Sequence, residues 1–217
     1  MMLAYQPIRS LATIHMVAYQ GGAAANRIFS VIDKPIEIKD EDHLPELQIK
    51  NSEIEFKNVS FKYKSTNEKA INNINLKIEG GKITALVGQS GAGKSTIINL
   101  IPRFYDPQDG EIIIDNQNTK KIRLKSLRKR ISLVSQDVIL FDDTIKNNIA
   151  YANPKASEES IQQACKFAAA DEFIEKLPSK YNTIVGENGI RLSGGQKQRI
   201  SIARAILKKS PIILLDE

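Results

Sequence analysis

The sequence predicts an α/β fold with a parallel-rich core sheet, an antiparallel β region and a helical subdomain. Short strand-like and helix-like segments follow one another along the chain, which indicates an α/β core. Several of the strand segments are continuous apolar runs, the pattern of strands buried on both faces of a parallel sheet. The length of 217 residues, with 41% hydrophobic and 26% charged residues, predicts one or two ordinary globular domains.

Cysteine content indicates the cellular compartment of the protein, but neither it nor the net charge indicates an activity. The net charge of +6 is too small and too dispersed to identify a partner. The single cysteine, Cys165, excludes an intramolecular disulfide framework and favours a reducing, intracellular compartment. We expect Cys165 to be a packed helical residue and not a nucleophile.

Three regions divide the chain. Residues 1–32 predict a helix from about Pro7 to Val31, because neither a membrane span of roughly 20 apolar residues nor a signal peptide fits them well. Residues 33–52 are acidic and contain prolines, which is typical of a linker. Residues 53–217 form the globular domain.

Within this domain the strand and helix patterns are distinct. Alternating segments predict half-exposed strands, and unbroken apolar runs predict buried ones. The alternating strands are 54–59, 61–63 and 74–78, and the buried strands are 83–87, 131–134 and 212–215. Helical spacing covers 157–177 and 194–209. The basic residues between Lys120 and Arg130 predict an amphipathic helix with a solvated basic face and with Ile122, Leu124 and Leu127 turned inward. The alternative is that this basic face binds nucleic acid or an anionic membrane surface.

A phosphate-binding loop follows the apolar run 83–87. Its residues match G-x-x-x-x-G-K-[ST]: Gly88, Gln89, Ser90, Gly91, Ala92, Gly93, Lys94 and Ser95, followed by Thr96. Glycines let backbone N–H groups surround phosphates, the lysine reaches the β- and γ-phosphates, and the serine hydroxyl binds Mg²⁺. A strand before the loop and a helix after it favour nucleoside triphosphate binding over a glycine-rich turn.

The last strand ends in two carboxylates. Ligands of open α/β sheets bind at the carboxyl ends of the strands. Asp216 is therefore a candidate Mg²⁺ ligand, acting through water, and Glu217 a candidate general base for the attacking water. An apolar strand ending in Asp-Glu is ordinary by itself, and the nearby phosphate loop favours the functional interpretation.

A second anion-binding surface precedes the helix 194–209. It comprises Leu192, Ser193, Gly194, Gly195 and Gln196, in which Ser193 is a good N-cap and the glycines leave backbone N–H groups uncovered. A capped surface helix without a ligand is the alternative. Together with the phosphate loop and the Asp-Glu strand, this segment resembles the signature of the ATP-binding cassette (ABC) superfamily, which implies a P-loop NTPase cassette fold.

The resemblance implies further site residues. It implies that the signature closes on the ATP held by the phosphate loop of a second subunit. Tyr63 matches the aromatic residue that stacks on adenine, although a half-buried strand aromatic is an equal alternative. Gln136 matches the glutamine that touches Mg²⁺ and the lytic water and links nucleotide state to the transmembrane part.

The flanking segments resemble exporters of this superfamily. Residues 140–145, 148–151 and 185–189 are similar to exporter sequences, and residues 25–33 resemble the cytoplasmic end of the last transmembrane helix of fused exporters. Residues 1–32 are therefore expected to be that helix end, and 53–217 the ABC ATP-binding domain. The whole chain most resembles the bacterial lipid A flippase type.

This resemblance implies an ATP- and Mg²⁺-dependent motor at the cytoplasmic face of the bacterial inner membrane. The expected partners are a second copy of the cassette, the transmembrane domain of the same exporter and, through it, a lipid, with no nucleic acid. One alternative is a soluble ABC ATPase acting on nucleic acid, but the chain has neither the duplicated cassette nor the coiled-coil insert that this class would carry.

The second alternative is a nucleotide-binding remnant that does not hydrolyse ATP. In the family the cassette continues with a switch histidine and a partner-contact segment, and both His15 and His43 lie too far upstream to replace that histidine. The chain is therefore expected to be a C-terminally truncated fragment that binds ATP weakly and hydrolyses it poorly.

Overall fold

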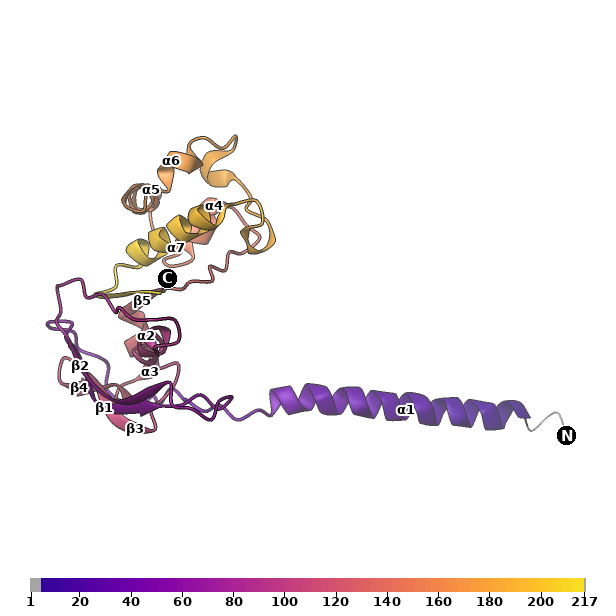
Figure 1. Cartoon of the computed structure of the whole chain (residues 1–217). Helices are drawn as coiled ribbons and strands as arrows, with labels where there is room; N and C mark the ends of the chain where they lie inside the picture. Colours follow the sequence, from indigo (N-terminus) through magenta and orange to yellow (C-terminus); the bar gives the residue numbers. More distant parts are fainter. Residues whose placement is uncertain (1–4, 217) are drawn as a thin grey trace. The chain divides into compact units, whose positions relative to one another are not determined.

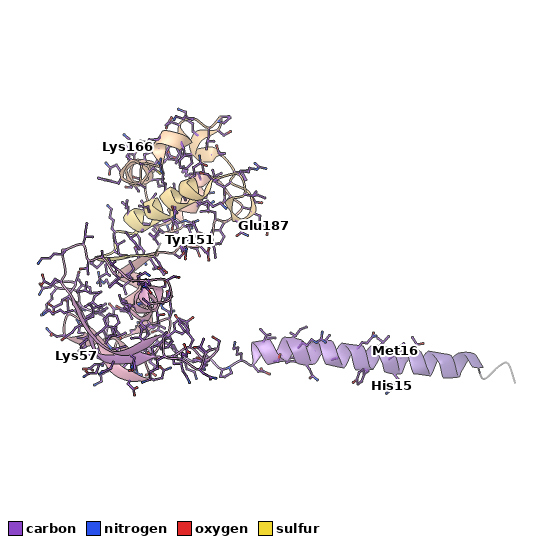
Figure 2. The ribbon with its side chains drawn as sticks, viewed as in Figure 1. His15, Met16, Lys57, Tyr151, Lys166 and Glu187 are labelled. Atoms are coloured by element: carbon purple, nitrogen blue, oxygen red, sulfur yellow. The ribbon has the colours of Figure 1, made fainter. Side chains whose placement is uncertain are left out.

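A computed structural model describes residues 5–216, with side chains from residue 13 onward (Figure 1). The chain divides into two compact units, one ending at Lys39 and the other beginning at Asp40. The first unit contains helix α1, Tyr5–Ile32, which confirms the helix predicted from about Pro7 to Val31. His15 and Met16, labelled in Figure 2, project from this helix, and Met16 is exposed. Among residues 5–216, no helix has the length and hydrophobicity of a membrane span.

The second unit begins with an antiparallel sheet. Its strands are β1 (Ile54–Phe61), β2 (Ile71–Ile78), β3 (Asp109–Ile114) and β4 (Gln117–Asn118), in the order β2-β1-β3-β4. A register shift in β1 lies between Phe56 and Val59, where Asn58 adopts a φ of 49°. Such a bulge adds a residue and lets both Phe56 and Val59 face the interior, where each is at most 1% exposed.

Two short helices contribute to the interior next to this sheet (Figure 1). They are α2 (Lys94–Leu100) and α3 (Leu124–Lys129), and α3 follows a 3₁₀ turn at Thr119–Lys121. Ile122, Leu124 and Leu127 are buried, and Lys121, Lys125 and Lys129 are exposed. The predicted burial of Ile122, Leu124 and Leu127 under a basic solvated face is therefore confirmed, but the α-helix is shorter than predicted and Ile122 precedes it.

The segment 40–52, predicted to be part of a linker, belongs to the second unit and packs on the rest of that unit. Leu47 is fully buried, and its backbone N–H donates to the Ser126 hydroxyl at 3.1 Å. The Asp115 carboxylate, in the β3–β4 turn, accepts hydrogen bonds from the backbone N–H groups of residues 50–53. Burial alone would raise the pKa of Asp115, but these four donors outweigh it, and the pKa is lowered. We call this arrangement the Asp115 clasp.

The parallel part of the fold is smaller than predicted. It consists of β5 (Ile131–Val134) and β6 (Ile212–Leu215), which pair in register from Ile131 with Ile212 to Val134 with Leu215. Both strands have the predicted bounds. The expectation of a parallel-rich core is wrong for the described residues, since two strands are parallel and four are antiparallel.

The strand predicted at 83–87 is also absent. This segment has no strand hydrogen bonding, and Ile83 and Val87 are 102% and 93% exposed. An apolar run becomes a buried strand only when neighbouring strands and covering layers receive it, and these are non-local features that the run does not encode. Ile213 and Leu215 of β6 are also exposed.

The helical subdomain contains four α-helices. They are α4 (Ile145–Ala150), α5 (Glu158–Phe167), α6 (Asp171–Ile174) and α7 (Gly194–Lys208), with 3₁₀ turns at Lys180–Asn182 and Glu187–Gly189. The helix predicted over 157–177 is split by Ala169, whose φ of 50° ends α5. Ile149, Cys165, Ile174 and Ile200 form part of one apolar cluster and are fully buried.

The subdomain has a buried thiol in its apolar cluster and is attached to β5 at one end. Burial raises the pKa of the Cys165 thiol to about 11, which is consistent with the predicted packing role. At the C-terminal end of α7, the Lys208 ammonium donates to the backbone carbonyls of Arg128, at 2.9 Å, and Ile131. This end of α7 is therefore attached to the beginning of β5.

Candidate functional site

The phosphate loop lies on the surface between the segment 83–87 and helix α2. Gly91 and Gly93 have φ values of 81° and 86°, and a Cβ on Gly93 would lie 2.7 Å from the Ala70 carbonyl oxygen. Glycine is therefore required at position 93 by both conformation and space. The Lys94 ammonium donates to the carbonyls of Gly88 and Gln89, both at 2.9 Å. The loop thus curves around its own lysine, the group predicted to reach phosphate.

Of the three residues predicted to contact Mg²⁺, Ser95 and Asp216 lie together at the start of α2. The Ser95 hydroxyl donates to Oδ1 of Asp216 at 2.9 Å, although 121 residues separate them. The Asp216 N–H donates to the Val134 carbonyl at 2.9 Å, so the pairing of β6 with β5 directs Asp216 to this point. Glu217, the predicted general base, lies outside the described residues.

The donor set at this point fits Mg²⁺. Mg²⁺ prefers oxygen ligands and usually keeps several waters, so it is typically bound by one or two carboxylates together with phosphate oxygens. Ser95 and Asp216 supply one hydroxyl and one carboxylate. Among the described side chains, no cluster of three or more His, Cys, Asp or Glu residues forms a dedicated metal cage. This arrangement favours a cation that arrives with a phosphate ligand.

Tyr63 lies two residues beyond β1 and contacts both an aromatic cluster and α2. Its hydroxyl hydrogen bonds to the Thr96 hydroxyl at 3.1 Å. Its ring meets Phe61 and Tyr105 edge to face, with centroids 4.8 and 5.2 Å away. The half-buried ring is thus fixed next to the helix that follows the phosphate loop, while stacking on adenine stays a prediction. Tyr105 was not predicted; its only signal is the Phe-Tyr pair before Asp106.

The signature segment forms the N-terminus of α7. The Ser193 hydroxyl accepts from the Gln196 N–H at 3.3 Å, and the Gln196 side chain accepts from the Ser193 N–H at 2.9 Å, which completes a capping box. Leu192 is buried in the apolar cluster. Gly194 and Gly195 are exposed, and a Cβ added to either would meet no atom within 4 Å. The backbone N–H groups at this helix end are therefore accessible to an anion.

Gln136 lies next to the signature helix of its own chain. Gln136, Asp137 and Val138 line a cavity of about 480 Å³ together with Gly194, Gly195, Lys197 and Gln198. Within the described residues, no hydrogen bond joins Gln136 to Ser95 or Asp216. The structure thus joins Ser95 to Asp216 by a hydrogen bond and places Gln136 beside the signature helix of the same chain.

Arg204 and Asn148 are polar residues of this region for which the sequence predicted no role, although Asn148 begins the exporter-like stretch 148–151. Arg204 lies on α7 and Asn148 on α4, and their side chains hydrogen bond at 2.7 Å. Burial lowers the pKa of the Arg204 guanidinium. An arginine within the apolar spacing of α7 is the only signal that the sequence offers for this contact.

Comparisons with known proteins agree with these features. The family model for ABC transporters matches residues 71–217. The ATP-dependent lipid A-core flippase of Syntrophus aciditrophicus is 46% identical over 217 residues, and that of Haemophilus influenzae 48% over 218 residues. Each alignment covers all of this chain but only 36% and 37% of the relative.

A solved structure is also similar along nearly the whole chain. It is described as a bacterial Atm1-family ABC exporter with ATP bound, and it matches with a TM-score of 0.87 at 41% identity. The match covers 98% of this chain and 37% of that one. The chain thus spans a little over a third of the length of these relatives.

Proposed function

The chain belongs to the ABC transporter family, and from this membership we propose that it is the ATP-binding and ATP-hydrolysing motor domain of a bacterial inner-membrane exporter. The observation that carries the proposal is the hydrogen bond between Ser95, in the phosphate loop, and Asp216, at the end of β6. It joins a phosphate-binding loop to a carboxylate in the way that nucleoside triphosphate chemistry requires.

Each predicted residue has a role in this proposal. Lys94 exchanges its two carbonyl acceptors for the β- and γ-phosphates, and the loop N–H groups hold the phosphate chain. Ser95 and Asp216 would hold Mg²⁺, which would neutralise charge on the phosphates. Glu217 orients and deprotonates the attacking water, and Gln136 contacts this water. Tyr63 contacts the adenine base of ATP.

The second subunit completes the site. Ser193, Gly194 and Gly195 at the N-terminus of α7 present N–H groups to the γ-phosphate held by a second copy. The exposure of this helix end supports that role. Residues 1–32 would continue from the transmembrane domain, and the cassette would act at the cytoplasmic face of the membrane. The proposed cargo is a lipid of the lipid A type, which rests on the named function of the two flippase relatives.

Binding of a fluorescent ATP analogue tests the proposal. Lys94→Ala removes a charge-assisted contact of about 1.5–3 kcal/mol, which corresponds to a loss of affinity of roughly 10- to 150-fold. Lys82→Ala is the matched control, because Lys82 lies just before the loop and pairs with Glu79. We expect the control to bind like the unmodified chain. Equal affinity of the Lys94 variant and the control would refute the assignment of the phosphate loop.

A further inference from the structure

Arg204 connects the signature helix to the segment that follows Gln136. Its Nε donates to the Asn148 carbonyl at 2.6 Å, and one terminal nitrogen donates to the Ile139 carbonyl at 2.7 Å. The other terminal nitrogen donates to Oδ1 of Asn148 at 2.7 Å. The guanidinium also lies over the ring of Phe141, 6.0 Å from its centroid. One side chain of α7 therefore holds three acceptors outside that helix.

Asn148 extends this connection through the rest of the segment. It is 1% exposed, and its Oδ1 accepts from the Phe141 N–H at 2.9 Å. Its amide nitrogen donates to the carbonyls of Phe141 and Thr144, both at 3.0 Å. Residues 139–144 are thus fixed to α4 by Asn148 and to α7 by Arg204. Buried polar networks in which every member is satisfied hold their parts rigidly, because breaking one bond leaves an unpaired group.

The same segment begins beside the nucleotide-facing part of the signature. Gln136 and Val138 line one cavity with Gly194 and Gly195. The Arg204 network starts one residue later, at Ile139, and reaches α7 ten residues from Gly194. Gln136 therefore faces the signature across the cavity, and Arg204 joins the segment that follows Gln136 to the signature helix.

From this geometry we propose that Arg204 is a positioning residue that makes the segment 136–144 and the signature helix α7 move together. A displacement of Gln136 on nucleotide binding is then transmitted to the Ser193–Gly195 end of α7 in the same chain. This inference rests on the proposed function, because it requires nucleotide at the phosphate loop. It assigns to Arg204 the connection between the phosphate-loop site of one chain and the signature surface that the same chain offers to its partner.

Arg199 provides a matched control on the same helix. Its terminal nitrogen donates to the Ala169 carbonyl at 2.8 Å and to Glu172 at 3.1 Å, at the α5–α6 junction. Arg199 is thus an arginine of the same helix that also donates to groups outside it. Its partners Ala169 and Glu172 lie at the α5–α6 junction and not in the segment after Gln136. In Arg199→Met and Arg204→Met, an unbranched apolar side chain replaces the aliphatic part of the arginine, and the guanidinium donors are lost.

Hydrogen exchange measured by mass spectrometry tests the proposal on the full 217-residue chain. Exchange is compared with and without Mg²⁺ and a non-hydrolysable ATP analogue, at a concentration at which sedimentation shows monomers, so that no partner covers the signature. We expect the analogue to change exchange in peptides covering 88–96, 136–144 and 193–198. In Arg204→Met the change at 88–96 should remain, while that at 193–198 should fall about threefold or more. Arg199→Met should retain both.

The outcomes separate the two proposals. A full response at 193–198 in Arg204→Met would overturn the role of Arg204, as would a response confined to 88–96 in the unmodified chain. Absence of any response at 88–96 would instead refute nucleotide binding itself. If circular dichroism shows that Arg204→Met does not fold, Arg204→Lys keeps the charge and can reach fewer of the three acceptors. Its response at 193–198 should then be intermediate, and an unchanged response would again overturn the proposal.

Discussion

Removing the Asp115 carboxylate should destabilise the second unit and release the segment that precedes β1. Oδ2 accepts from the N–H groups of Lys50, Asn51 and Ser52 at 2.6, 3.1 and 3.0 Å, and Oδ1 accepts from Glu53 at 3.0 Å. In Asp115→Ala all four donors lose their acceptor at once. Among the described residues, no other side chain accepts a hydrogen bond from any of these four N–H groups.

The expected magnitude follows from the exposure of the four donors. The bonds from Lys50 and Asn51 are exposed, so water can replace them at little cost. Those from Ser52 and Glu53 are only partly buried, so each unpaired donor costs about 1–2 kcal/mol, the lower part of the range for buried groups. Asp115→Ala should therefore lower the free energy of unfolding by about 2–4 kcal/mol. At a urea m-value of about 2 kcal/mol/M, the midpoint should fall by about 1–2 M.

Urea unfolding followed by far-ultraviolet circular dichroism measures this change. Asp42→Ala is the control, because Asp42 pairs with Arg123 but is 87% exposed, and such a surface pair contributes at most about 1 kcal/mol. Hydrogen exchange adds a local measurement, since the amides of residues 50–53 should lose protection only in the Asp115 variant. Equal midpoints for the two variants would refute the clasp as a stabilising feature.

The clasp should also depend on pH. The folded-state pKa of Asp115 lies below its ordinary value of 3.8, because the backbone donors outweigh the opposing effect of burial. Its contribution is complete above that value and is lost as the pH falls through the lowered folded-state pKa. The stability difference between the unmodified chain and Asp115→Asn should therefore be constant near neutral pH and shrink below 3.8. A difference that grows on acidification would contradict the sign of this shift.

Two further predictions concern the helical subdomain. Ser193→Ala removes the capping oxygen of α7 and should cost about 1 kcal/mol in urea unfolding, whereas Ser193→Thr should cost less than half of that; equal losses would exclude the cap as the cause. Cys165 is fully buried with a pKa of about 11, so a thiol reagent at about pH 8 should modify it only after denaturant is added. Rapid labelling of the folded chain would contradict the packing assigned to it.

Local signals predict the elements whose structure depends on near neighbours. Strands β5 and β6 have the predicted bounds because each is a short β-branched and apolar run bounded by polar residues. Helix α7 begins where Ser193 offers a cap and ends within one residue of the prediction. The signals for these elements lie within the elements themselves.

Features that depend on distant residues are harder to predict. The run 83–87 has the composition of a buried strand, but hydrogen-bonded neighbours decide whether such a run is a strand. The proximity of Ser95 and Asp216 follows from the pairing of β6 with β5, two strands far apart in the sequence, and not from any local pattern. The Arg204 network and the Asp115 clasp consist of side-chain bonds to distant backbone groups, and such bonds have no periodicity that a sequence pattern could reveal.

Lys208 attaches the C-terminal end of α7 to the start of β5, and this attachment sets the scale of motion at the other end of the helix. Its fifteen residues extend about 22 Å at 1.5 Å per residue. Lys208 ties the far end to the carbonyls beside β5, while Gly194 at the near end is open to solvent. A tilt of only about 5° about the tied end would carry Gly194 by about 2 Å, the difference between a formed and a broken hydrogen bond. If Ser193–Gly195 bind the partner's phosphate as proposed, a rotation of this size at the β5 end of α7 would be enough to make or break that contact.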